Sequence, residues 1–211
     1  VTIRLLDPPL HEFLPHEQDE IMAFAKAADL EEKAVSQRLA QLKEANPMLG
    51  HRGCRLGITY PEIYEMQVEA ILEAALDAKS KGKVVTPEIM IPLIATKEEY
   101  VLLEKRVKAV AEKVFAERSD KIEYKIGTMI ELPRAALCAD EIAEHAEFFS
   151  FGTNDLTQTT LGISRDDAGR FLPIYAAQGI YERDPFASLD QTGVGQLVEM
   201  AAEKGRKVKP D

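Results

Sequence analysis

Short apolar runs alternate along the chain with longer segments in which apolar residues recur every three or four positions. Runs of the first kind are typical of buried strands, and the second periodicity is typical of amphipathic helices. The short runs predict five strands, over residues 1–7, 50–59, 84–91, 126–131 and 148–155. The longer segments predict helices over residues 17–28, 29–46, 61–82, 96–114, 133–145 and 192–204. This alternation indicates a sheet of parallel strands.

Residues with strong preferences for helix ends support several of these helices. Asp29 with Glu32, and Thr96 with Glu99, have the spacing of a capping box, in which two side chains bind backbone N–H groups of the first turn. Gly205 follows the last periodic segment, where glycine favours a left-handed helix terminus. We therefore expect two helices to begin at these capping boxes and the last helix to end before Gly205.

The pattern favours a (β/α)₈ barrel over the nucleotide-binding sheets. No Asn-Gly hairpin signal is present, and neither a GxGxxG nor a GxxxxGK[ST] motif follows a strand. Polar residues recur instead after several different strands, which is typical of barrel enzymes. About five strands cannot close an eight-stranded barrel, and the chain opens without Met directly on a strand-like run. We therefore expect residues 1–211 to form an incomplete TIM-barrel domain cut from a longer protein.

Composition and charge restrict the partners. The chain has 26 Lys and Arg residues and 36 Asp and Glu residues, and the resulting net charge of -10 repels nucleic acid. Local arginines must therefore capture any anionic substrate. The two cysteines, Cys54 and Cys138, provide neither a disulfide framework nor metal-ligand spacing, which favours a reducing cytoplasm. No apolar run approaches the roughly 20 residues of a membrane span, so no membrane partner is expected.

Two of the predicted strands end in carboxylates. Glu131 ends the run that starts at residue 126, and Asp155 ends the run that starts at residue 148. A strand, a helix and a second strand over this length form a βαβ unit, which places both carboxylates at the same edge of the sheet. Two such anions repel each other unless a divalent cation or a proton lies between them, and among cations Mg²⁺ or Mn²⁺ suits carboxylate ligands. Two alternatives stay open: Glu131 pairs with Arg134, or Asn154 or Asp155 caps the next helix.

Groups that bind anions accompany the carboxylates. Arg4 and Arg52 offer planar forks for a carboxylate or a phosphate, although a buried Arg4 is also compatible with a structural ion pair. Backbone N–H groups around Gly152, Thr153 and Asn154 are expected to hold an anion where the next helix begins. Together with a cation, these groups predict a site for a small dianion or trianion such as an enolate or a phosphorylated enol. The cation would stabilise negative charge that develops on oxygen.

Six longer motifs resemble a known family. They are VTIRLLDPPLHEFLP, NPMLGHRGCRLGITYPEIYEMQ, PEIMIPL, IGTMIELPRAAL, FFSFGTNDLTQTTLGISRDDAG and DPFASLDQTGVGQLVEMA. These runs are similar to the carboxy-terminal domain of the pyruvate, phosphate dikinase family, and the resemblance spans essentially the whole chain. The FGTNDLTQ run alone resembles a wider group that includes phosphoenolpyruvate synthase and enzyme I of the sugar phosphotransferase system.

The resemblance implies a function for the domain. It implies a barrel that binds pyruvate or phosphoenolpyruvate (PEP) with Mg²⁺, in a cytoplasmic homodimeric phosphotransferase with paired acceptors. A mobile phosphohistidine domain would exchange a phosphoryl group with the ligand, after an ATP-grasp domain has charged the histidine. The net reaction would interconvert ATP, phosphate and pyruvate with AMP, pyrophosphate and PEP. The resemblance also assigns seven residues to substrate binding: Arg4, Arg52, Glu131, Gly152, Thr153, Asn154 and Asp155. Of these, Glu131 and Asp155 would also be the metal ligands. Arg165 matches a further substrate-binding arginine of enzyme I, and this assignment is the weaker one.

Several expected parts of this family are not found in the sequence. The first barrel strand, the last two strands with a catalytic cysteine in a Cys-Gly-Glu motif, and the phosphohistidine and ATP-grasp domains have no match. Neither Cys54 nor Cys138 occupies the catalytic position, so we assign no catalytic residue and expect no complete turnover by this chain alone. Two other hypotheses stay open: a Mg²⁺-dependent pyruvate-enolate lyase of the citrate-lyase or aldolase type, and a non-catalytic module that acts through dimerisation or through binding by its helices.

Overall fold

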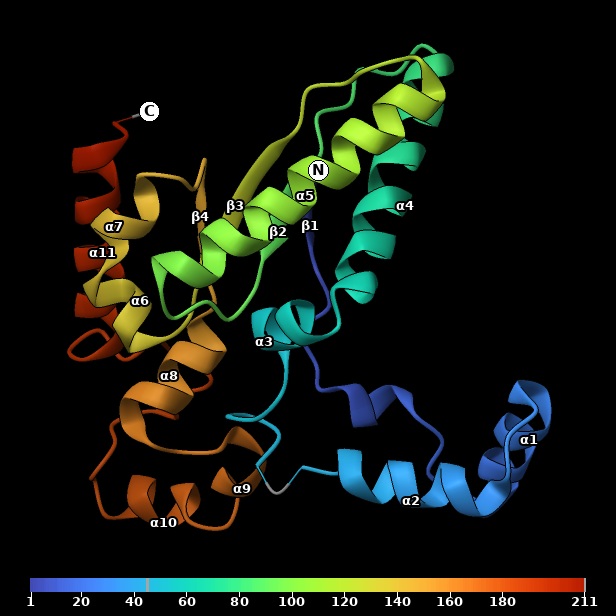
Figure 1. The fold of residues 1–211 in the computed structure, drawn as a ribbon. Helices are drawn as coiled ribbons and strands as arrows, with labels where there is room; N and C mark the ends of the chain where they lie inside the picture. Colours follow the sequence, from blue (N-terminus) through green and yellow to red (C-terminus); the bar gives the residue numbers. More distant parts are fainter. Residues whose placement is uncertain (45, 211) are drawn as a thin grey trace.

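A single parallel sheet forms the centre of the molecule. The computed structural model describes residues 1–44 and 46–210, so the predicted domain end at 211 lies outside them. Within these residues the sheet has four strands, β1 Thr2–Arg4, β2 Glu88–Ile91, β3 Lys125–Ile130 and β4 Phe149–Phe151. Each strand pairs in parallel with the next one along the chain, and the sheet curls (Figure 1). This arrangement confirms the predicted incomplete (β/α)₈ type of fold.

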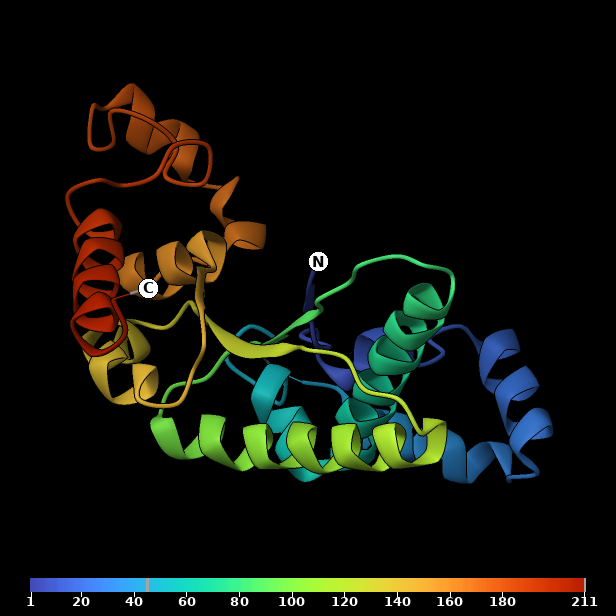
Figure 2. The ribbon, with the colours of Figure 1, turned by 90° about the horizontal axis from the view of Figure 1, so that it is seen from above.

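Two long helices cover one face of the sheet. They are α4 Pro61–Ser80 and α5 Lys97–Arg118, which lie beside each other and run along the sheet (Figure 2). Alternate strand residues point toward them, because successive side chains of a strand face opposite sides. The fully buried strand residues in this core are Ile89, Ile91, Ile126 and Ile130. This packed layer gives the strand ends a rigid support.

The remaining helices flank the sheet and its carboxyl edge. They are η1 Leu10–Phe13, α1 Gln18–Ala28, α2 Glu32–Leu42, α3 Gly53–Thr59, α6 Pro133–Leu137, α7 Ala139–Ala143, α8 Thr153–Leu161, α9 Arg165–Ala168, α10 Leu172–Ala177 and α11 Val194–Val208. Helices α6, α7 and α11 pack beside β4, while α1 and α2 form a hairpin that projects from the body (Figures 1 and 2). Helices α3 and α8 lie at the carboxyl ends of the strands.

The strand predicted over residues 50–59 is wrong, because most of this segment forms helix α3. Its expected place in the sheet is taken by β2, which pairs directly with β1. Buried Cys54 and Leu56 anchor the helix in the core, while Gly57 leaves room for the ring of Tyr64. The described sheet therefore has four strands rather than about five.

Several predicted element ends also need correction. The segment predicted as a buried first strand reduces to β1, an exposed strand at the edge of the described sheet. Asp29 does not cap α2; it ends α1 in a left-handed conformation with φ of 54°. The capping box of Thr96 and Glu99 is confirmed. The helix expected over residues 133–145 divides at Cys138 into α6 and α7.

The last helix also runs further than predicted. Helix α11 continues through Gly205 to Val208. A Cβ atom at residue 205 would lie 2.8 Å from the Cε2 atom of Phe149, so glycine here permits close packing between α11 and β4. The glycine therefore marks a tight contact between two elements, and the prediction that it ends the helix was wrong.

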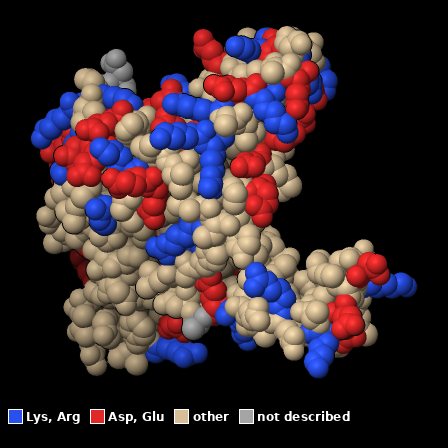
Figure 3. Space-filling view, viewed as in Figure 1, with Lys and Arg blue, Asp and Glu red and all other residues tan. Residues whose placement is uncertain are grey.

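Charged side chains are spread over the outer helices. On the face drawn in Figure 3, acidic and basic residues mix around α4, α5, α7 and α11, and the region of α8 to α10 is mostly uncharged. None of the helices in the described part of the chain combines the length and the hydrophobicity that crossing a bilayer requires. The surface in this view offers no continuous basic face of the kind that attracts polyanions.

Candidate functional site

A cavity of about 620 Å³ opens at the carboxyl ends of the strands. It is bounded by residues that follow β1, β3 and β4 and by the start of α3. All residues that the sequence assigned to a ligand line this cavity, namely Arg4, Arg52, Glu131, Gly152, Thr153, Asn154, Asp155 and Arg165. The fold therefore brings these residues together, and their roles in binding stay predictions.

Arg52 lies at the centre of a buried ion-pair network. It is only 8% exposed, and its Nη1 and Nη2 atoms donate to the two carboxylate oxygens of Asp155 at 3.2 and 3.1 Å. Nη2 also donates to Asp7. Burial lowers the pKa of Arg52, but its hydrogen bond to Asp155 and the negative charge of Asp7 outweigh burial and raise the pKa above its usual value. The guanidinium is therefore a permanent positive charge held in a fixed orientation.

Asp7 is a cavity residue that sequence reasoning missed. Its carboxylate accepts a hydrogen bond from Nη1 of Arg4 at 2.5 Å as well as one from Arg52. The structural ion pair considered for Arg4 is thus present, and Arg4 lines the cavity at the same time. The available signal was the spacing of Arg4, the last residue of β1, and Asp7, which comes three residues later. By bridging two arginines, Asp7 holds them side by side at the cavity wall.

Glu131 follows β3 and is almost completely buried. Its Oε1 atom accepts the backbone N–H of Leu93 at 2.6 Å. The alternative pairing with Arg134 is not formed, because Arg134 donates to the carbonyl of Ala95 at 2.7 Å. Burial raises the pKa of Glu131 to about 8, and the negative charges of Asp7 and Asp155 add to the effect. The negative charge of Asp155 thus acts on the Glu131 carboxyl and favours its protonated form.

The turn that holds Glu131 has an unusual backbone conformation. Leu93, just after β2, is buried and has a φ of 60°, which few residues other than glycine adopt. The carbonyl oxygen of Leu93 accepts a hydrogen bond from the thiol of Cys54 at 3.1 Å. The backbone N–H of Cys54 donates to the carbonyl oxygen of Pro92 at 3.2 Å. A Cβ atom at Gly53, whose φ is also positive, would lie 2.7 Å from the Cβ atom of Leu93. The turns before Cys54 and around Leu93 therefore interlock, and they hold Arg52 and Glu131 respectively.

Substitution of Gly53 by Ala is expected to lower the free energy of unfolding by about 2–4 kcal/mol, because strain at positive φ adds to the clash with Leu93. Gly82→Ala is the matched control for strain alone, since Gly82 has a φ of +74° and, its chain neighbours aside, no atom of the described residues within 4 Å of the added methyl group. Gly169→Ala has neither feature and should leave stability nearly unchanged. Urea denaturation measures all three. Equal losses for Gly53→Ala and Gly82→Ala would contradict the interlocked turns.

The segment after β4 turns directly into helix α8. Gly152 is its N-cap residue, and Asn154 and Asp155 lie in its first turn, so the idea that either caps a later helix was wrong. The helix begins where the sequence placed an anion-binding group of backbone N–H donors. A Cβ atom at Gly152 would lie 2.7 Å from both Cβ of Glu131 and Sδ of Met129. Glycine at this position therefore leaves space for the Glu131 side chain.

The donor atoms suit a hard divalent cation that takes few protein ligands. No group of three or more His, Cys, Asp or Glu residues is arranged to hold a metal within residues 1–44 and 46–210. Mg²⁺ commonly takes one or two carboxylates and completes its shell with water and ligand oxygens. Glu131 and Asp155 provide two such carboxylates at one cavity. Oε2 of Glu131 forms no hydrogen bond to the described residues, whereas Asp155 is shared with Arg52.

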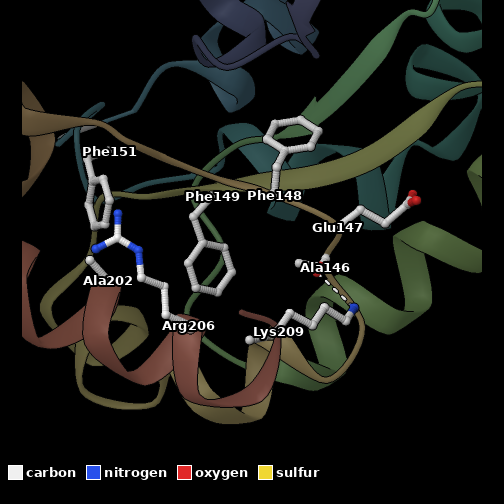
Figure 4. A pocket seen from close by; sticks show the side chains of 10 residues that line it. Ala146, Glu147, Phe148, Phe149, Phe151, Ala202, Arg206 and Lys209 are labelled. Atoms are coloured by element: carbon white, nitrogen blue, oxygen red, sulfur yellow. Dashed lines mark hydrogen bonds between the residues drawn. The ribbon is translucent and has the colours of Figure 1, made fainter. Parts of the chain in front are cut away.

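A smaller cavity of about 190 Å³ lies between β4 and helices α7 and α11 (Figure 4). Phe149 points into it, the guanidinium of Arg206 lies beside Phe151, and Lys209 donates to the carbonyl of Ala146 at 3.0 Å. Its lining is mainly aromatic and aliphatic, and it shares no residue with the first cavity. It lacks the paired carboxylates and arginines, so the larger cavity is the candidate site.

Comparison with known proteins gives one family match over almost the whole chain. The model described as "PEP-utilising enzyme, PEP-binding domain" matches residues 1–209. Similar proteins include "Pyruvate, phosphate dikinase 1, chloroplastic" of Arabidopsis thaliana, 59% identical over 100% of this chain, and "Pyruvate, phosphate dikinase" of Clostridium symbiosum, 58% identical over 100%. "Pyruvate, phosphate dikinase" of Rhizobium meliloti (strain 1021) is 59% identical over 99% of the chain. The chain spans only 22%, 24% and 23% of the lengths of these relatives.

Proposed function

Because the chain belongs to the PEP-utilising enzyme family through its PEP-binding domain, we propose that it binds PEP and pyruvate in the cavity at the strand ends. The observation that carries the proposal is the convergence of Arg4, Arg52, Glu131 and the start of α8 on this one cavity. In the whole protein the bound ligand would exchange a phosphoryl group with a phosphohistidine domain, as part of a pyruvate, phosphate dikinase reaction. A homodimeric assembly belongs to the same proposal.

The positive groups of the cavity suit the two charged ends of PEP. Arg4 and Arg52 are held side by side by Asp7, so their guanidinium groups are already oriented before a ligand arrives. The first N–H groups of α8 provide further donors, and the positive end of the helix dipole favours an anion there. These local groups counter the net charge of -10, which otherwise disfavours anionic ligands.

A divalent cation, Mg²⁺ or Mn²⁺, is part of the proposal, with Glu131 and Asp155 as its protein ligands. Such a cation would stabilise the negative charge of a pyruvate enolate oxygen. The backbone N–H of Leu93 fixes one oxygen of Glu131, which leaves the other free to act as a ligand. At the same cavity, Arg52 holds Asp155, and Asp7 holds both Arg4 and Arg52.

No residue of the chain is assigned to proton transfer at the methylene carbon. Cys54 is buried against the carbonyl of Leu93, and burial raises the pKa of its thiol, so it packs as a neutral residue of the core. Neither cysteine lines the cavity. The residues present therefore bind and orient the ligand.

Oxalate, a stable mimic of the pyruvate enolate, tests the proposed function. We expect calorimetry to show oxalate binding in the presence of Mn²⁺ and at least tenfold weaker binding after the metal is removed with a chelator, because ligand and protein share the coordination shell. Acetate, which cannot chelate through two carboxylates, serves as the control and should bind far more weakly. Equal binding of oxalate with and without Mn²⁺, or no binding by the folded chain, would refute the proposal.

A further inference from the structure

Gln158 lines the cavity but belongs to none of the predicted groups. It follows Asp155 by three residues on α8, so the two side chains share one face of the helix. The residue is 5% exposed, and both ends of its side-chain amide form hydrogen bonds. Nε2 donates to Oδ1 of Asp155 at 3.3 Å, and Oε1 accepts the backbone N–H of Arg165 at 2.7 Å. A buried amide satisfied at both ends has a fixed orientation.

Arg165 connects this amide to the rim of the cavity. It is the first residue of α9, and its Nη1 atom donates to Oδ1 of Asn154 at 3.1 Å. Asn154 precedes Asp155 in the first turn of α8. Three hydrogen bonds and the peptide bond between Asn154 and Asp155 therefore link Asn154, Asp155, Gln158 and Arg165 in a closed loop, and each of the four residues lines the cavity.

The short connection from α8 to α9 depends on Gln158 in a second way. The helix ends at Gly162 in a left-handed conformation, and the N–H groups of Gly162 and Ile163 both donate to the carbonyl of Gln158. Helix α9 has only four residues, so its own hydrogen bonds stabilise it little. The backbone of Arg165 is thus positioned by bonds to the end of α8, among which the Gln158 side chain binds the Arg165 N–H directly, while Asn154 holds the guanidinium.

We propose that Gln158 is a positioning residue that holds Arg165 at a fixed distance from Asp155. Asp155 stands at the proposed metal end of the site, and Arg165 provides a positive charge at its rim. Through one amide, Gln158 fixes the spacing between these two ends, so that a ligand with two anionic ends meets both at once. The inference rests on the proposed function, because it assigns Arg165 to the same anionic ligand.

A double-mutant cycle with Arg165 tests this role. Gln158→Met keeps the length of the side chain and removes both hydrogen bonds, and we expect it to weaken Mn²⁺-dependent oxalate binding about tenfold, as loss of a supporting hydrogen bond commonly does. Arg165→Ala should weaken binding at least as much. If Gln158 acts through Arg165, the double variant is no weaker than Arg165→Ala alone. Gln196→Met, at an exposed glutamine on α11, is the matched control and should bind like the wild type.

Gln158→Glu provides a second cycle, should the methionine variant fail to fold by circular dichroism. Its carboxylate can still accept a hydrogen bond from the Arg165 N–H. Arg165→Ala should therefore weaken oxalate binding in the Gln158→Glu background as much as it does in the wild type. The inference would be overturned if the losses of oxalate binding from Gln158→Met and Arg165→Ala are additive. It would also be overturned if Arg165→Ala no longer weakens oxalate binding in the Gln158→Glu background. Wild-type binding for Gln158→Met would also overturn it and leave the proposed function intact. Absence of Mn²⁺-dependent binding in the wild type would overturn both.

Discussion

Replacement of Arg52 by methionine is expected to lower the free energy of unfolding by about 3–5 kcal/mol, the usual cost of removing one partner from a buried ion pair. The substitution leaves the carboxylates of Asp7 and Asp155 buried without the guanidinium that both contact. Oxalate binding should be lost as well, because Arg52 is the buried cation of the cavity. The cost comes from the uncompensated carboxylates rather than from the packing of the side chain, which methionine largely preserves.

Urea denaturation with two comparisons separates these causes. Arg55→Met removes a neighbouring arginine whose side chain, among residues 1–44 and 46–210, donates only to the carbonyls of Leu49 and Gly50, and it should cost about 1 kcal/mol. A triple variant that adds Asp7→Asn and Asp155→Asn to Arg52→Met removes the buried charges and should recover at least half of the lost stability. If the triple variant is no more stable than Arg52→Met, repulsion and burial of the two carboxylates do not cause the loss of stability in Arg52→Met.

Replacement of Glu131 by glutamine should abolish the Mn²⁺-dependent part of oxalate binding, a loss of about 100-fold or more, because a neutral amide is a poor ligand for a hard cation. Glutamine keeps the size of the side chain and can still accept the N–H of Leu93. The fold is therefore expected to persist. Calorimetry with and without Mn²⁺ measures the effect, and residual binding that still requires the metal would show that Glu131 is not a ligand.

The pH dependence of stability provides a second measurement on the same variant. The folded pKa of Glu131 is raised to about 8 from an ordinary value of 4.5, so between these values the folded chain holds a proton that the unfolded chain has lost. Wild-type stability should therefore fall as the pH rises from about 5 to about 8. Glu131→Gln lacks this contribution and should show a smaller fall in urea denaturation without metal. Identical pH slopes would indicate that the Glu131 carboxyl is not destabilised by burial.

The fold was predictable where hydrophobic period and helix-end chemistry agreed. The βαβ unit around β3 and β4 and the capping box at Thr96 follow from short-range patterns, and the structure has both. The segment from residue 50 to 59 was wrongly predicted as a strand. Glycines and arginines interrupt its apolar positions, so the patterns of a short helix and of a strand are similar here. Only tertiary packing, with β2 beside β1, decides between them.

The site was predictable to the extent that charged side chains follow strands. Glu131 and Asp155 were found in this way, and the cavity does contain both. The groups that hold them were not predictable, because they are main-chain atoms or side chains that take their role from geometry. The N–H of Leu93 depends on a left-handed backbone that leucine rarely adopts, and the amide of Gln158 meets Arg165 only after α8 ends at a glycine.

The order of the sheet has a consequence for folding. The strands β3 and β4 are separated only by two short helices, whereas β1 and β2 are separated by the hairpin of α1 and α2 together with α3 and α4. Closing a longer loop costs more chain entropy, so we expect β3 to pair with β4 early and β1 to join the sheet last. Arg4 and Asp7 arrive with β1. The cavity would then be assembled in the final step, after the layer of α4 and α5 has formed.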